Sequence, residues 1–142
     1  MSGITRYGSG GPWEEKFGYS RLVVAGPNAY ISGCTAVVDG IVNHEGDPFN
    51  QALTAFGVAV KALGEAGFAK EHIVRTRMYV VHPRDVDDVG RAHRELFADV
   101  RPAATLIVVS KLIDPQMLVE VEIDAYRGGV DATTAANAGT PQ

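Results

Sequence analysis

The sequence predicts an α+β fold in which a mixed β-sheet carries two helices on one face. Three observations support this class: strand and helix patterns follow in the order strand, strand, helix, strand, helix, strand, strand; the last strand alternates cleanly; and both helical stretches carry one apolar stripe. The chain has 142 residues, 46% of them hydrophobic. That length suits one domain, which we expect over residues 1–127.

Residues 1–18 are rich in glycine and serine, so we expect mostly loop with a short strand near residues 4–7. The next two strands, residues 21–25 and 29–35, flank the turn cluster Gly26-Pro27-Asn28 and predict a hairpin. In the second strand Tyr30, Ser32 and Cys34 are expected to share one face. Two short apolar pairs, at 37–38 and 41–42, then flank the tight-turn dipeptide Asp39-Gly40.

The first long helix has clear boundaries in the sequence. Asp47 suits the N-cap, Pro48 the first helical position, and Gly67 the stop. Its apolar residues recur with helical spacing and form one stripe, consisting of Phe49, Ala52, Leu53, Phe56, Val60 and Leu63. This helix is expected to pack against the sheet.

A strand over residues 73–81 comes next, in which Val74, Thr76, Met78 and Val80 are expected to face one way. A second helix follows, with Asp85 as the expected cap and Asp88 three residues later. The apolar side of that helix consists of Val86, Val89, His93, Leu96 and Phe97. On that side His93 reads as a core-edge histidine rather than a catalytic one.

Residues 101–126 predict two final strands joined by a turn at Asp114-Pro115. The second of them alternates, with Met117, Val119, Val121, Ile123 and Ala125 on one side and Leu118, Glu120, Glu122, Asp124 and Tyr126 on the other. Three carboxylates therefore stand in a row on one face. A solvated sheet face, a subunit interface and a functional site would each accommodate such a row.

Composition excludes several classes of function. The net charge of −4 argues against a nucleic-acid surface, and the apolar runs are too short to span a membrane. One cysteine and four scattered histidines make no zinc pattern, and Cys34 reads as a small buried residue. The N-terminus lacks a signal-peptide core, so a cytoplasmic location is expected. Residues 128–142 are expected to form a disordered tail.

Four short motifs resemble those of the Rid (YjgF-like) family, the enamine/imine deaminase superfamily. Gly18-Tyr19-Ser20 resembles an early G-P-Y-S segment, and Ile31-Ser32-Gly33 resembles a strand ending in (V/I)-S-G. The stretch at 101–105, RPAAT, resembles the segment around P-A-R-(S/T). Residues 118–122, LVEVE, resemble (L/K)-(V/I)-E-(I/V)-E. Together the motifs span residues 18–126.

The resemblance implies a chorismate-mutase-like fold and a homotrimer with small-molecule clefts between subunits. It implies hydrolysis of 2-imino or 2-enamino acids to 2-oxo acids and ammonia, without a metal or organic cofactor. Glu120 would align the attacking water, and Tyr19 and Ser32 would line the pocket. The arginine that clamps the substrate carboxylate in this family corresponds to Ala104. Alanine offers no donor to a carboxylate.

Arg101 and Arg21 are the two candidates to replace that arginine. Along a continuous strand, a shift of three residues reverses the face, so Arg101 substitutes directly only if the chain bends at Pro102. Two functions therefore stay open: an imine hydrolase with Glu120 as its catalytic residue, and a non-catalytic trimer that binds a metabolite. Ribonuclease activity, also attached to the family, is disfavoured by the acidic balance and by the absence of a histidine pair.

Overall fold

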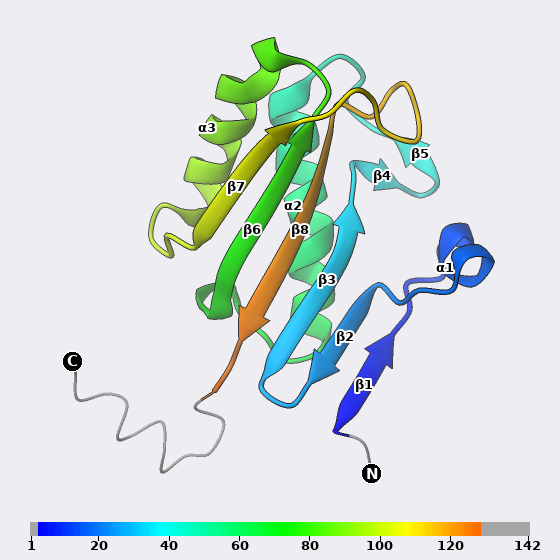
Figure 1. Cartoon of the computed structure of the whole chain (residues 1–142), viewed down its shortest axis with the longest axis vertical. Coiled ribbons are helices and arrows are strands. Elements are labelled where there is room, and N and C mark those ends of the chain that lie inside the picture. The colour runs from blue at the N-terminus through cyan, green and yellow to red at the C-terminus, as the bar shows by residue number, and fades with distance from the viewer. Residues whose placement is uncertain (1–2, 129–142) are drawn as a thin grey trace.

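The computed structural model describes residues 3–128 and confirms the α+β class (Figure 1). Six strands form a mixed sheet in the order β1-β2-β3-β8-β6-β7, and both long helices lie on one face of it. The strands of this sheet are β1 (Ile4–Tyr7), β2 (Leu22–Ala25), β3 (Asn28–Cys34), β6 (Ile73–Val80), β7 (Ala103–Val108) and β8 (Val119–Tyr126). We call the side of the sheet that the helices leave uncovered the open face.

Helix α2 (Pro48–Glu65) begins and ends as its sequence predicts. The Asp47 carboxylate accepts a hydrogen bond from the Asn50 backbone N–H at 3.0 Å. Beyond the helix Gly67 takes a φ of 86°, a left-handed conformation that suits glycine. The predicted stripe packs on the sheet, with Ala52, Phe56 and Leu63 buried and Phe49, Leu53 and Val60 half-buried against the core.

Helix α3 (Val86–Phe97) follows a 3₁₀ turn at Pro83–Asp85, and a second 3₁₀ turn, Lys70–His72, precedes β6. The predicted cap at Asp85 is wrong, because its side chain makes no capping hydrogen bond. Capping needs extended backbone at that position, whereas Asp85 is already helical, with φ −90° and ψ −4°. Its carboxylate instead lies 3.8 Å from Arg84 Nε.

The last two strands do not pair with each other, although two strands joined by a short turn are usually neighbours in a sheet. Strand β6 lies between them, parallel to β7 and antiparallel to β8. Helix α3 connects β6 to β7, and such a crossover makes consecutive strands parallel. The expected turn at Asp114-Pro115 is present, since the backbone N–H groups of Gln116 and Met117 both bond to Asp114.

Side chains of β8 alternate as predicted, with Val119, Val121, Ile123 and Ala125 buried. Irregularities in pairing change the predicted faces of β3 and β6. A register shift between Ile31 and Cys34 turns Cys34 into the core rather than beside Tyr30. A second shift near the start of β6 leaves Val74 48% exposed, although it was expected to face the core with Thr76.

The N-terminal region holds β1 where a short strand was expected, and also a helix, α1 (Pro12–Phe17), that was not. Proline at its start, two acidic residues in its first turn and Gly18 at its C-cap, with φ 77°, are ordinary helix boundaries. The glycine and serine residues on both sides of α1 led to the expectation of a loop, although these boundary residues are present in the sequence. The predicted turn at Asp39-Gly40 joins β4 (Val37–Val38) to β5 (Ile41–Val42).

Among the described helices, none is long and apolar enough to cross a membrane. The expected tail, 128–142, lies outside the described residues except for Gly128.

Candidate functional site

The open face carries the predicted row of carboxylates on β8. Strand β6 supplies their cross-strand neighbours, because Glu120 pairs with Tyr79, Glu122 with Arg77 and Asp124 with Arg75. All three carboxylates are half-buried at the centre of the sheet. The three carboxylates therefore lie on a central strand of the sheet, less exposed than most residues of its edge strands and outside the hydrophobic core.

The three carboxylates differ in whether they form a salt bridge with Arg77. Its guanidinium Nη1 lies 3.5 Å from Glu122 Oε1 and 3.4 Å from Asp124 Oδ2. None of the salt bridges within residues 3–128 involves Glu120. Glu122 and Asp124 are thus partners in an ion-pair network, whereas the Glu120 carboxylate is left for another role.

The Glu120 side chain lies over the backbone of Gly33 on neighbouring β3. A methyl group on Gly33 would overlap Oε2 of Glu120 and come within 2.8 Å of Cδ. Burial, followed by the charge of Glu122, raises the pKa of Glu120, and the charge of Arg21 partly opposes the rise. Burial raises the pKa of Tyr79 as well, assisted by Glu122. A carboxylate with a raised pKa beside a neutral phenol is a candidate acid–base group.

Arg21 holds the irregular end of β3 that lies beneath Glu120. Its Nη1 donates to the carbonyl oxygens of Ser32, at 3.1 Å, and Gly33, at 2.6 Å. The Ser32 hydroxyl donates back to the Arg21 carbonyl at 3.1 Å. Arg21 is therefore bound to backbone, and its charge reaches Glu120 without a direct ion pair. Burial raises the pKa of the adjacent Cys34 thiol to about 11, so Cys34 is a neutral structural residue.

Tyr19 lies in the loop between α1 and β2. It lines a cavity of about 460 Å³ whose other walls are Arg6, Glu14, Glu15, Gly18 and Ser20. Glu14 connects this cavity to the Ser32 region, because its Oε2 lies 3.9 Å from Arg21 Nε. The structure thus links Tyr19, Ser32 and Glu120 through Arg21 rather than by direct contact.

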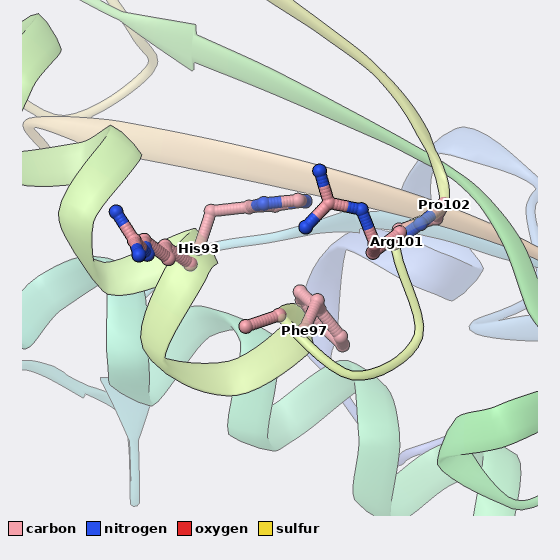
Figure 2. Close-up of a pocket in the computed structure, with 6 residues that line it drawn as sticks. His93, Phe97, Arg101 and Pro102 are labelled. Atoms are coloured by element: carbon pink, nitrogen blue, oxygen red, sulfur yellow. The ribbon is translucent and has the colours of Figure 1, made fainter.

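Ala104 and Arg101 lie apart from that group. Ala104 is exposed on the edge strand β7 and pairs with Thr76, whose side chain is buried toward the helices, so Ala104 and Glu120 belong to opposite faces. Arg101 precedes β7 and lines a cavity of about 580 Å³ on the helix side (Figure 2). The other residues of this cavity are His93, Arg94, Phe97, Ala98 and Pro102.

Three residues of the open face were not singled out as functional from the sequence: Gly33, Arg77 and Tyr79. Gly33 had a signal, because it closes the Ile31-Ser32-Gly33 motif and a glycine within a strand permits close approach of another group. Arg77 and Tyr79 alternate along one strand, but only the pairing of β6 with β8 brings them to the carboxylates. Residues 3–128 contain no group of three or more acidic, histidine or cysteine side chains placed to hold a metal.

Comparison with known proteins places this geometry in a family. The model of the endoribonuclease L-PSP family matches residues 14–127. An uncharacterized protein of Streptomyces coelicolor, SCO2049, is 50% identical over 129 residues, covering 91% of this chain and 96% of its own. The crystal structure of Rv2704 from Mycobacterium tuberculosis, a member of the YjgF/YER057c/UK114 family, is 36% identical, with a TM-score of 0.78 over 87% of this chain and 98% of that one.

A solved Rid-family protein from Yersinia pestis, YyfA, shares the fold at 24% identity, with a TM-score of 0.72 over 77% of this chain and 87% of that one. These structures confirm the chorismate-mutase-like α+β fold. The chain belongs to the endoribonuclease L-PSP family, which is the YjgF or Rid family.

Proposed function

We propose that this protein hydrolyses a small imine or enamine to a carbonyl compound and ammonia. The observation that supports this most is the Glu120 carboxylate, half-buried over Gly33 with a raised pKa and no part in the salt bridges around it. A carboxyl group whose pKa is raised above its usual value suits general acid–base work. No metal or organic cofactor is needed for the steps below.

In the proposed reaction Glu120 accepts a proton from a water molecule as the water oxygen attacks the imine carbon. A new C–O bond forms as the C=N π electrons move to nitrogen, and Glu120 returns the proton to that nitrogen, which gives a neutral carbinolamine. Glu120 then takes the proton of the carbinolamine hydroxyl and delivers it to the amine nitrogen, so the C–N bond breaks, its electrons leave with ammonia, and an oxygen lone pair forms the C=O bond. Burial destabilises the charged form of Glu120 and raises its pKa, which makes the carboxylate a stronger base toward the attacking water.

We further propose that the substrate binds in clefts between the subunits of a homotrimer. The sheet has an open face with exposed or half-buried Tyr30, Arg77 and Tyr79, and helices cover only the opposite side. Glu120 and Ala104 belong to opposite faces of one chain, so a cleft that includes both positions needs two copies. Light scattering tests the assembly, and a clean monomer mass would contradict interface clefts.

A second function, binding of a metabolite without turnover, is favoured by one observation. Ala104 is a methyl side chain on an edge strand and offers neither charge nor hydrogen bond to a substrate carboxylate. Losing a charge-assisted hydrogen bond costs about 1.5–3 kcal/mol. We do not extend the family's endoribonuclease name to this chain as an activity, because its net charge of −4 provides no electrostatic attraction for RNA.

One assay separates hydrolysis from binding. An amino-acid oxidase generates 2-iminobutanoate in situ, and its disappearance is followed with and without micromolar protein. Hydrolysis predicts acceleration over the spontaneous rate, and the acceleration should be lost in Glu120→Gln. Asp124→Asn is the matched control, because Asp124 lies on the same face of β8 and contacts Arg77 rather than Glu120. No acceleration by the wild-type protein would refute the hydrolase, and calorimetric binding of 2-oxobutanoate in that case would support the second function.

A further inference from the structure

Arg101 has an unusual backbone for its residue type. Its N–H donates to the Phe97 carbonyl at 2.8 Å, which adds one more helical bond after α3, and its φ of 56° closes the turn in the left-handed region. Glycine is the usual residue in such a position, because any other L-residue there costs on the order of 1 kcal/mol. Since the strand β7 begins only at Ala103, strand alternation does not dictate which side Arg101 occupies.

The Arg101 side chain lies in the cavity of about 580 Å³ at the end of α3. Figure 2 shows its guanidinium and the His93 ring directed toward one another, with Phe97 beside them. Phe97 is buried and provides an apolar wall, and Arg94 is another of the lining residues. This volume is within the range that holds small ligands, which is about 300–1,000 Å³.

Neither arginine of this cavity has an acidic partner in the described part of the chain. The salt bridges there use Arg21, Lys70, Arg77, Arg84 and Arg91 as their cations. His93 Nε2 lies 2.8 Å from the hydroxyl of buried Thr76, and burial lowers the pKa of His93. With the Thr76 hydroxyl donating to Nε2, the neutral imidazole carries its proton on Nδ1 and can donate one hydrogen bond to an anion.

We propose that this cavity binds the carboxylate of a small ligand, with Arg101 as the clamp and His93 as a second donor. A guanidinium matches a carboxylate with two parallel hydrogen bonds, and a left-handed arginine with no acidic partner places that fork in the cavity. Thr76 pairs with Ala104 across β6 and β7 and bonds to His93, so the cavity lies on the side of the sheet that Ala104 faces. This inference rests on the proposed function in one respect: the bound carboxylate is taken to be that of the 2-imino acid that the protein hydrolyses.

The test measures binding of 2-oxobutanoate, a stable product, to the full chain by calorimetry. Arg101→Gln should weaken its affinity about tenfold to a hundredfold, the range expected when a charged hydrogen-bond partner is removed. Arg84→Gln is the matched control, because Arg84 is exposed and lies outside the cavity, and its affinity should equal that of the wild type. The neutral 2-oxobutanamide should bind Arg101→Gln and wild type equally.

Arg101→Gly distinguishes binding from a structural role. Glycine relieves the left-handed backbone, so this variant should melt no lower than the wild type and yet lose 2-oxobutanoate binding. Affinity unchanged in both Arg101 variants, no 2-oxobutanoate binding by the wild type at millimolar ligand, or tighter binding of inorganic phosphate would each overturn the carboxylate site.

Turnover is scored separately from binding. Binding that depends on Arg101, without any imine hydrolysis, would refute the proposed reaction and leave this site standing. Imine hydrolysis with the same KM in Arg101→Gln and in the wild type would refute this carboxylate site and leave the proposed reaction standing.

Discussion

Replacing Gly33 by alanine tests whether the position of the Glu120 carboxylate determines activity. The added methyl group would overlap Oε2 of Glu120 and lie 2.8 Å from Cδ and 3.3 Å from Cγ. These atoms belong to a flexible side chain rather than to backbone, so the side chain can rotate away. The expected result is a folded protein with a displaced carboxylate.

The two effects of Gly33→Ala can be estimated separately. Forcing Glu120 from its rotamer costs about 0.5–1.5 kcal/mol, and replacing glycine by alanine at an unstrained backbone returns about 0.4–1 kcal/mol. The free energy of unfolding should therefore change by about 1 kcal/mol or less, which is at most about 4 °C in Tm for a chain of this size. A shift of about 1 Å in a catalytic group costs on the order of a hundredfold in rate.

Circular dichroism gives Tm, and the imine assay gives kcat/KM. Gly57→Ala is the matched control, because Gly57 is exposed on α2 and a methyl group there meets nothing within 4 Å. That control should raise stability by about 0.5–1 kcal/mol and leave kcat/KM unchanged. Wild-type kcat/KM in folded Gly33→Ala would refute the role of Glu120 position, and a drop in Tm of about 10 °C or more would show that Glu120 cannot move aside.

Three further outcomes follow from the core and from the perturbed pKa values. Phe56 is fully buried with its ring 5.1 Å from that of Phe97, so Phe56→Ala should cost about 3–5 kcal/mol and lower Tm by about 10 °C in a melting experiment. Burial holds the pKa of Cys34 at about 11, so Ellman's reagent should leave the native thiol unmodified at pH 8 and react in guanidinium; rapid native reaction would contradict the burial. The folded protein binds a proton at Glu120 above the usual pKa of 4.5, so unfolding free energy should fall as pH rises from there toward neutral. Glu120→Gln should remove that fall in denaturant titrations, and an identical pH slope would contradict it.

Local sequence patterns predicted the elements well and their partners less well. Asp47, Pro48 and Gly67 marked α2 because capping and left-handed stops depend on a few adjacent residues. The alternation of β8 survived because the extra residue at each irregularity lies in the partner strand, β3 or β6, and β8 keeps its two-residue period. Neither rule depends on distant parts of the chain.

The predicted faces were wrong where the pairing between strands interrupts the two-residue alternation of side chains. Register shifts in β3 and β6 turned Cys34 inward and Val74 outward. Gly33 is a residue typical of such an irregularity in β3, whereas the start of β6 contains no glycine or proline. The same limit applies to the site. The sequence singled out Glu120 by its motif, but the contact with Gly33 and the pairing with Tyr79 exist only once β8 lies between β3 and β6.

The placement of Glu120 and Arg101 on opposite sides of one sheet leads to a test by mixing subunits. If one cleft takes Glu120 from one subunit and Arg101 from its neighbour, Glu120→Gln and Arg101→Gln damage different halves of it. Both variants should be poorly active alone below saturating substrate. After unfolding and refolding together in equal amounts, about a quarter of the clefts in a closed ring should combine an intact Glu120 with an intact Arg101. Activity should therefore recover to about a quarter of the wild-type value. No recovery in mixed oligomers verified by native mass spectrometry would show that the two residues do not serve one cleft between subunits.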